Sequence, residues 1–328
     1  MRKRTLQIGV DVGQEKVWAT SSKQKPRPFD HTETGVKELY NWARKGNPDT
    51  ILHFCMEATG VYSQSLAVRL LKYPATQVSI INPAQIAAFA KAQLRRTKTD
   101  KIDAQVILAF AHSQSPKPWT PEPLAWQQLY ALVAQADALR ANQRQWANRE
   151  HTQGYTPNLP KTVCTITTAT LRFLDEQLTI VEKAIAELCE NDPLLKSHRD
   201  LLCTIPGVGK LSAVRFLAYG KSNLTDYSAR ALVAHAGLAP RHRQSGTSVQ
   251  GKSYIAKQGN KHLRHALYMP TLVAITHNPI IRHHYQRLLN NDKPKMVALV
   301  ACMKKLLLIS RAILITKKPF DPTIIPLT

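Results

Sequence analysis

The first third of the chain alternates short apolar runs with segments of helical spacing. Residues 6–12 predict a buried strand, Gly13 turns the chain, and residues 16–20 predict a second strand that pairs with the first as a hairpin. Further strands are expected at 50–56 and 77–81, and helices at 61–72, 84–93 and 101–112. Strands mixed with helices at this spacing indicate an α/β domain.

The pattern changes after a proline-rich segment, 115–123, which we interpret as a stiff linker and a domain boundary. Beyond it, apolar residues step by three and four along two predicted helices, which is the seam spacing of packed helices. One seam contains Leu129, Leu132, Ala136, Leu139, Gln143 and Trp146, and the other contains Leu171, Leu174, Leu178, Val181, Ile185 and Leu188. The seams fit either a helical hairpin that packs within its own chain or a coiled coil that also joins subunits.

The last third predicts helices interrupted by glycine-rich turns, and it ends in a long helix over residues 293–316. We therefore expect three regions along the chain. These are an α/β domain over 1–118, a helical region with the two seams over 119–195, and a mainly α-helical C-terminal domain over 196–328.

The net charge of the chain limits the classes of partner that it is expected to bind. Its 328 residues include 45 Lys and Arg against 22 Asp and Glu, a formal net charge of +23. This excess favours a polyanion, usually nucleic acid, and a membrane surface is the alternative. No bilayer span is predicted, because the best candidate, 296–315, carries three cations in its middle, and the N-terminal run is too short for a signal peptide. The five cysteines lack metal-site spacing, so we expect reduced core thiols in a cytoplasmic protein.

Four acidic residues stand at positions that favour a common site. Asp11 lies in an apolar strand, where a carboxylate is costly unless it is paired or binds a metal, and Glu57 ends another predicted strand. Asp100 and Asp103 lie three residues apart at the start of a helix and so share one face. Carboxylates that converge need a cation, and ligands that are all oxygen suit Mg²⁺ or Mn²⁺. The order strand-Asp, strand-Glu, helix-Asp is that of RNase H-like nucleases, although each helix acid alone fits a simple interaction with the helix dipole.

Cations next to these acids are typical of a phosphodiester substrate, whose backbone they would hold. They are Arg95, Arg96, Lys98 and Lys101. The alternative is a solvated basic face.

The segment 205–210, Ile-Pro-Gly-Val-Gly-Lys, followed by an apolar stretch, predicts a helix-hairpin-helix-like motif. Its glycines, Gly207 and Gly209, would let the backbone approach a phosphate, with Lys210 beside them at a helix N-terminus. A plain glycine turn between two helices is the alternative.

Residues 237–248 have neither helical nor strand periodicity and are predicted to form a loop with hydroxyl groups among cations. Ser245 could attack a phosphodiester there, while cations stabilise the developing charge, although such a loop is more often only a phosphate-binding loop or no site at all. The cations are Arg241, Arg243 and Lys252, and Lys261 and Arg264 open the next helix. No acid or cysteine completes a metal site with the nearby histidines, so we interpret these as solvated or facing DNA.

Five motifs in order carry a family resemblance. They are Ile-Gly-Val-Asp at 8–11, Met-Glu-Ala-Thr-Gly at 56–60, Lys-Thr-Asp-Lys-Ile-Asp-Ala at 98–104, Ile-Pro-Gly-Val-Gly at 205–209, and Pro-Arg-His-Arg-Gln-Ser-Gly-Thr-Ser at 240–248. Together they cover nearly the whole chain and resemble the DEDD-type insertion-sequence transposases, the bridge-RNA-guided serine recombinase family of bacterial mobile elements.

The resemblance implies an N-terminal RuvC-like RNase H-fold domain, a coiled-coil region and a C-terminal transposase domain with a nucleophilic serine. By position this serine is Ser245, with Ser248 a close second. The resemblance also implies a structured non-coding guide RNA that pairs with double-stranded donor and target DNA. It implies homo-oligomers, dimers or tetramers, in which the acids of one subunit meet the serine of another.

The expected function is therefore that of an RNA-guided, Mg²⁺-dependent DNA recombinase. One alternative is a RuvC-like nuclease that cuts with metal-activated water and needs no serine. Another is a nucleic-acid-binding protein without enzymatic activity, which gives no reason for an acid in the first strand.

Overall fold

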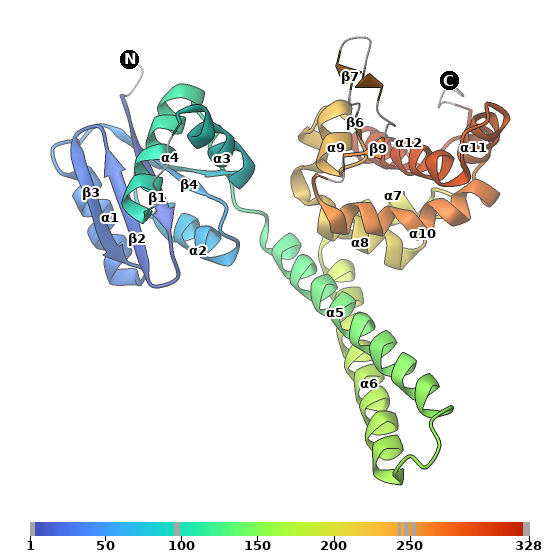
Figure 1. Cartoon of the computed structure of the whole chain (residues 1–328). Helices are drawn as coiled ribbons and strands as arrows, with labels where there is room; N and C mark the ends of the chain where they lie inside the picture. Colours follow the sequence, from blue (N-terminus) through green and yellow to red (C-terminus); the bar gives the residue numbers. More distant parts are fainter. Residues whose placement is uncertain are drawn as a thin grey trace. The chain divides into compact units, whose positions relative to one another are not determined.

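The computed structural model describes residues 4–94, 99–241, 244–245, 249–250, 254–256 and 258–323 (Figure 1). The chain divides into two compact units, Met1–Pro121 and Glu122–Thr328. We call them the α/β unit and the helical unit and describe each by itself. The expected mixed architecture, an α/β part followed by a mainly helical part, is confirmed.

A sheet of five strands in the order β3-β2-β1-β4-β5 forms the centre of the α/β unit. β2 is antiparallel to both β1 and β3, while β1, β4 and β5 run parallel to one another. The strands are β1 Thr5–Val12, β2 Lys16–Ser21, β3 Gln24–Asp30, β4 Ile51–Glu57 and β5 Thr76–Ile81, and the helices are α1 Glu33–Arg44, α2 Val61–Leu70, α3 Pro83–Ala92 and α4 Asp100–Gln114. The predicted strands and helices are all present. The pattern did not predict β3 and α1.

The two faces of the sheet have separate apolar cores. Even-numbered residues of β1 and β4, such as Ile8 and Phe54, pack with α1 and α2. The other face carries α4, whose Ile107 and Phe110 pack with Cys55 of β4. Side chains alternate between faces along a strand, so odd-numbered residues of β1 and β4 point toward α4.

Helix α4 lies directly on β1, and Gly9 makes this close approach possible. A Cβ atom at Gly9 would overlap the carbonyl oxygen of Ala104 and the backbone nitrogen of Leu108. A glycine inside a strand often marks such a contact between backbones.

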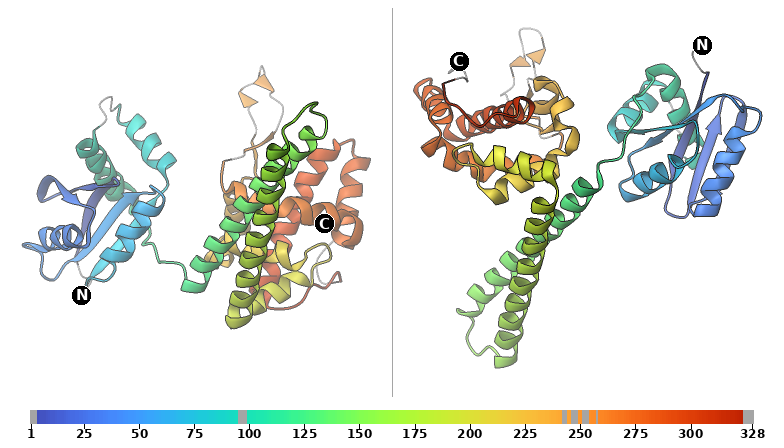
Figure 2. Two further views of the ribbon diagram at one scale, coloured as in Figure 1. Left: turned by 90° about the horizontal axis from the view of Figure 1, so that it is seen from below. Right: turned by 180° about the vertical axis from the view of Figure 1, so that it is seen from behind.

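The helical unit begins with the two long helices that the seams predicted, α5 Leu124–Gln153 and α6 Lys161–Asn191. They lie side by side as an antiparallel helical hairpin (Figure 2), with Arg140 bonded to Glu182 at 2.6 Å and Gln153 bonded to Thr167 at 2.8 Å. The seams thus pack on each other within one chain.

The remaining helices are α7 Pro193–Cys203, α8 Lys210–Gly220, the 3-10 helix η1 Ser222–Asp226, α9 Ala229–His235, α10 Lys261–His277, α11 Pro279–Asn290 and α12 Lys295–Thr316. They share a core with the base of the helical hairpin, in which Leu129 and Ile185 pack together with residues such as Leu307. The long last helix, α12, is as predicted. No helix within the described residues is long and apolar enough to cross a membrane.

The segment predicted as a loop contains short strands, so that prediction was wrong in part. β6 Pro240–Arg241 pairs with β9 Tyr254–Ile255, and β7 Gln244–Ser245 pairs with β8 Val249–Gln250. We call residues 240–255 the serine arm. Strands of two residues are too short to leave an alternating apolar pattern, which explains why the sequence did not reveal them.

Candidate active site

Asp11 and Glu57 lie at the ends of two neighbouring parallel strands. Val10 and Met56 form the last pair between β1 and β4, and each acid comes directly after one of them. Because side chains alternate along a strand, Asp11 shares the face of Gly9, and Glu57 shares the face of Cys55. Both acids therefore face α4, and both are half-buried.

Asp100 and Asp103 lie in the first turn of that helix. Thr99 caps α4 by accepting a hydrogen bond from the backbone nitrogen of Ile102 at 3.3 Å. Asp103 directly precedes Ala104, the residue that faces Gly9, and Asp11 lies two residues beyond Gly9. β1 and α4 thus each place one acid, Asp11 and Asp103, close to the point where the two elements touch. Asp103 is half-buried and Asp100 is exposed.

The four acids do not form a ready-made metal site. Across the described parts of the chain, no three His, Cys, Asp or Glu side chains lie close enough together to hold a metal ion. The structure places the four predicted ligands on one face of the sheet and one helix end, and their donors are all carboxylate oxygens. This donor set fits Mg²⁺ or Mn²⁺.

Of the four cations predicted beside the acids, one lies within the described residues. Lys101 is exposed on α4. Arg95, Arg96 and Lys98 lie outside the described residues.

The glycine turn at 205–210 joins α7 to α8, which both interpretations of this segment predicted. Gly209 and Lys210 are exposed at the start of α8, and no side chain caps this helix end. Gly207 has a packing role of its own, because a Cβ atom there would lie 2.8 Å from the backbone nitrogen of Ala274 in α10. Phosphate binding by this turn stays a prediction.

Ser245 lies in β7, where its backbone pairs with Val249 of β8. The structure describes the backbone of Ser245 and Arg241 but not their side chains, and Arg243, Ser248 and Lys252 lie outside the described residues. The serine thus belongs to a paired strand within the serine arm.

The serine arm also contains a sequence pattern of nucleotide-binding loops. Residues 246–253 read Gly-Thr-Ser-Val-Gln-Gly-Lys-Ser, which matches Gly-x-x-x-x-Gly-Lys-Ser. In that loop the pattern leads from a strand into a helix. Here Val249 and Gln250 form a strand inside the pattern, and the next helix begins at Lys261. The match therefore lacks the structural context of a P-loop.

The two cations predicted at the start of α10 differ in their surroundings. Lys261 is exposed, whereas Arg264 is half-buried and its guanidinium donates a hydrogen bond to the Ala236 carbonyl oxygen at 3.1 Å. Arg264 therefore has a structural contact at the end of α9. Nearby, His262 stacks on Tyr219, with ring centroids 5.0 Å apart. Burial and the adjacent Lys261 lower the pKa of His262, which favours its neutral form.

One polar network was missed by the sequence analysis. Asp137 of α5 accepts hydrogen bonds from Arg215 at 2.9 Å and from the Tyr219 hydroxyl at 2.7 Å, both in α8. Arg140 also contacts it, at 3.4 Å. An acid directly after the seam residue Ala136 was the available signal. This network joins the base of the helical hairpin to α8.

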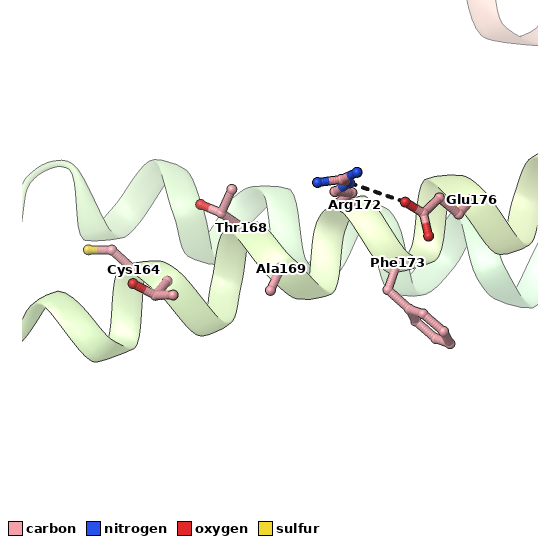
Figure 3. Close-up of a pocket in the computed structure, with 7 residues that line it drawn as sticks. Cys164, Thr168, Ala169, Arg172, Phe173 and Glu176 are labelled. Atoms are coloured by element: carbon pink, nitrogen blue, oxygen red, sulfur yellow. Dashed lines mark hydrogen bonds and ion pairs between the residues drawn. The ribbon is translucent and has the colours of Figure 1, made fainter.

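A hollow on the outer face of α6 contains none of the predicted site residues. Its lining includes Cys164, Phe173 and an ion pair between Arg172 and Glu176 at 3.1 Å (Figure 3). A single ion pair on one helix offers no catalytic arrangement. The acids of the α/β unit and the serine arm of the helical unit remain the candidate functional residues.

Two transposase family models match the chain, one over the part with the four acids and the other over the part with the serine arm. The match to the family described as "Transposase IS116/IS110/IS902 family" covers residues 199–286, and the match to the IS110 DEDD transposases covers residues 8–153. A pilin gene-inverting protein of Moraxella lacunata is 32% identical over 327 residues, which are 97% of this chain and 98% of that protein.

This chain belongs to the IS110 family of DEDD transposases. A second pilin gene-inverting protein, from Moraxella bovis, is 33% identical over 90% of each chain. An uncharacterized 42 kDa protein of insertion element IS900 from Mycobacterium paratuberculosis is 27% identical and covers 57% of this chain and 46% of its own length. The family matches confirm the resemblance to transposases. The two matched regions of this chain contain the four acids and Ser245.

Proposed function

We propose that this transposase cuts, exchanges and rejoins DNA strands, using a divalent cation held by the four acids and Ser245 as the nucleophile. The observation that carries the proposal is its likeness to two pilin gene-inverting proteins over nearly their whole length. Inverting a gene requires that both of its ends are cut and rejoined in the opposite orientation. A nuclease that only cuts would not do this.

The metal would be Mg²⁺ or Mn²⁺, bound by Asp11, Glu57, Asp100 and Asp103. Their shared face and all-oxygen donor set support this assignment. Bringing four carboxylates together requires a cation, because like charges repel strongly at short range. When bound, such an ion aligns attacking and leaving oxygens on phosphorus and offsets their charge.

The serine would conserve the energy of the phosphodiester bond between cutting and rejoining, by forming an ester with the phosphate. The Ser245 oxygen forms a bond to phosphorus, and the bond from phosphorus to one deoxyribose oxygen breaks. The serine proton ends on that oxygen, which leaves as a free hydroxyl group. Because one phosphoester replaces another, a hydroxyl group of a second strand can reverse the exchange without any cofactor that supplies energy.

We further propose that the protein acts as a homo-oligomer with a structured guide RNA that pairs with donor and target DNA. The net charge of +23 supports a large polyanionic partner. The RNA proposal is tested by sequencing RNA that copurifies with the protein and comparing it with the DNA that flanks its gene. RNA without any complement to that DNA would reject guidance and leave strand exchange untouched.

The test of the nucleophile is to trap the covalent intermediate on a nicked suicide substrate and identify the modified residue by mass spectrometry. We expect the adduct at Ser245, and no adduct or recombinant with Ser245→Ala, which should still bind DNA. An adduct at Ser248 would assign the role to that residue. Recombination by the double variant Ser245→Ala, Ser248→Ala would instead favour hydrolysis by metal-activated water.

The metal site is tested by Asp11→Asn, with Asp49→Asn as the control. Asp49 is an exposed acid just before β4, at the end of that strand away from Glu57. Asp11→Asn should abolish strand cleavage and leave DNA affinity unchanged, because the acids bind metal and do not hold phosphate. Asp49→Asn should cleave at the wild-type rate. Full cleavage by Asp11→Asn, or by the wild type in excess chelator, would exclude the metal site.

A further inference from the structure

The serine arm leaves and re-enters the helical unit at two adjacent points. Its first strand follows the end of α9, where the Leu238 nitrogen donates to the Val233 carbonyl oxygen at 3.0 Å. Its last strand leads toward α10. The two ends are tied by the β6–β9 pairing and by a hydrogen bond from the Ala256 nitrogen to the Ala239 carbonyl oxygen at 2.9 Å. The direction of the arm is therefore set at this root.

Asn260 connects three helix ends at the root. Its side-chain oxygen caps α10 by accepting hydrogen bonds from the nitrogens of His262 at 3.1 Å and Leu263 at 3.0 Å. Its backbone nitrogen donates to the His235 carbonyl oxygen, at the end of α9, at 2.7 Å. Its amide nitrogen donates to the Tyr219 carbonyl oxygen, near the end of α8, at 2.8 Å.

The residues that Asn260 contacts are themselves held in place. Tyr219 is buried, and its hydroxyl donates to Asp137, an acid that also pairs with Arg215. Burial and the Asp137 carboxylate raise the pKa of Tyr219, so the hydroxyl keeps its proton. On the other side, a Cβ atom at Gly259 would overlap the His235 carbonyl oxygen, so the missing side chain lets the root lie against the end of α9.

We propose that Asn260 is a positioning residue for strand cleavage, because the hydrogen bond from its side-chain amide to the Tyr219 carbonyl oxygen fixes the direction in which the serine arm leaves the helical unit. The inference rests on the proposed role of Ser245. Without this hydrogen bond the root can pivot about its remaining contacts, and a small rotation there displaces β7, the strand that contains Ser245. Attack on phosphorus depends steeply on the placement of the nucleophile, so the rate falls while binding is kept.

The test variant is Asn260→Ser, which keeps an oxygen for the helix cap and removes the amide donor. Asn278→Ser is the matched control. Asn278 caps α11 in the same way, through the nitrogens of Ile280 at 3.1 Å and Ile281 at 3.2 Å. Unlike Asn260, it has an amide nitrogen that is buried with no hydrogen-bond partner among the described residues. Of the two variants, only Asn260→Ser thus removes a hydrogen bond from the side-chain amide to a carbonyl oxygen.

The measurement is single-turnover adduct formation by the full-length protein on the suicide substrate, at a series of DNA concentrations. For Asn260→Ser we expect the rate at saturating DNA to fall about 10-fold or more, with half-saturation unchanged. Asn278→Ser should react at the wild-type rate. Thermal unfolding of both variants is recorded, since a purely structural role would lower Tm and activity together.

Two results would overturn the inference. One is a wild-type rate for Asn260→Ser, and the other is a loss of rate that merely follows a loss of folded protein. Should Asn260→Ser fail to fold, Asn260→Asp keeps the same cap acceptor and places oxygen against the Tyr219 carbonyl, so it must show the same slow step. A wild-type protein that forms no adduct at either Ser245 or Ser248 would instead reject the proposed function, which separates the two failures.

Discussion

Gly9 shows how one residue can set the distance between two elements that carry candidate metal ligands. It is the point where α4 lies against β1, within two residues of Asp11. In Gly9→Ala the new methyl group meets backbone atoms of α4, which cannot rotate away as a side chain can. We expect a loss of about 1–3 kcal/mol in the free energy of unfolding, as for other overpacked cores, together with reduced cleavage.

Urea unfolding checks this prediction, with Gly154→Ala as the control. Gly154 has helical dihedral angles, and a Cβ atom there would lie at an ordinary 3.4 Å from the His151 carbonyl oxygen. That variant should unfold like the wild type. Equal stability of Gly9→Ala and Gly154→Ala would show that α4 can move away from the sheet without cost.

His53 should make the stability of the α/β unit depend on pH. It is buried in β4, and its Nε2 lies 2.7 Å from the hydroxyl oxygen of Ser79, which contacts the Lys117 carbonyl oxygen at 2.7 Å. Burial lowers the pKa of His53. The unfolded chain therefore takes up a proton before the folded chain does. Stability from this group is complete above about pH 6.5 and is lost as the pH falls toward the lower folded pKa.

Unfolding of the wild type and His53→Gln by urea at pH 5 and pH 7.5 measures this contribution. Glutamine can donate to Ser79 but does not titrate, so the loss of stability between the two pH values should be smaller in the variant. The same loss in both proteins would assign the pH dependence to other groups, such as the half-buried His198 and His235, whose pKa values burial also lowers.

The sequence revealed the acids better than their surroundings. Asp11 and Glu57 could be predicted because a charge within or directly after an apolar run is conspicuous. The partners of Asp137 could not, because Arg215 and Tyr219 lie 78 and 82 residues away along the chain. Pairings over such separations depend on tertiary packing, which local pattern does not encode.

At the level of elements, the strands in the middle of the sheet were predictable and its edge was not. β1 and β4 are buried on both faces and read as continuous apolar runs. β3 lies at the edge, contains Pro26 and Pro28, and buries only Phe29. Prolines are tolerated on an edge strand, but they remove the pattern by which a strand is recognised.

The seams of the helical hairpin now have an intrachain role, which their spacing alone could not decide. Leu174 is buried between α5 and α6. Leu174→Ala should therefore destabilise the protein by about 2–4 kcal/mol through the cavity that it leaves. Thermal unfolding measures this effect, and an unchanged Tm would mean that the helices repack around the gap.

The proposed homo-oligomer would need an apolar surface outside those seams, and α6 offers one. Exposed apolar residues follow one flank of this helix at heptad-compatible spacing, namely Val163, Ile166, Phe173 and Ile180. As a hypothesis, a second copy covers this flank. Phe173→Ser should then lower the sedimenting mass with little change in Tm, opposite to Leu174→Ala. A wild-type mass for Phe173→Ser would reject this flank as the interface.

For the whole molecule, net charge is the property that can be read most directly from the sequence. The fold determines where the charged side chains lie. A net charge of +23 predicts that binding to DNA weakens steeply with salt, because each neutralised phosphate releases counterions. We expect two exposed lysines to contribute to this salt dependence. Lys210 and Lys261 are exposed at the starts of α8 and α10, next to the glycine turn and the serine arm.

Lys210→Ala and Lys261→Ala should each make the slope of log affinity against log salt shallower by about one, since each loses roughly one phosphate contact. Lys37→Ala is the control, because Lys37 is an exposed residue of α1, on the face of the sheet opposite to α4. Fluorescence anisotropy with a duplex at several salt concentrations measures the slopes. If Lys37→Ala flattened the slope as much as the other two, charge would act through its total amount. If it did not, the phosphate backbone would follow the ends of α8 and α10.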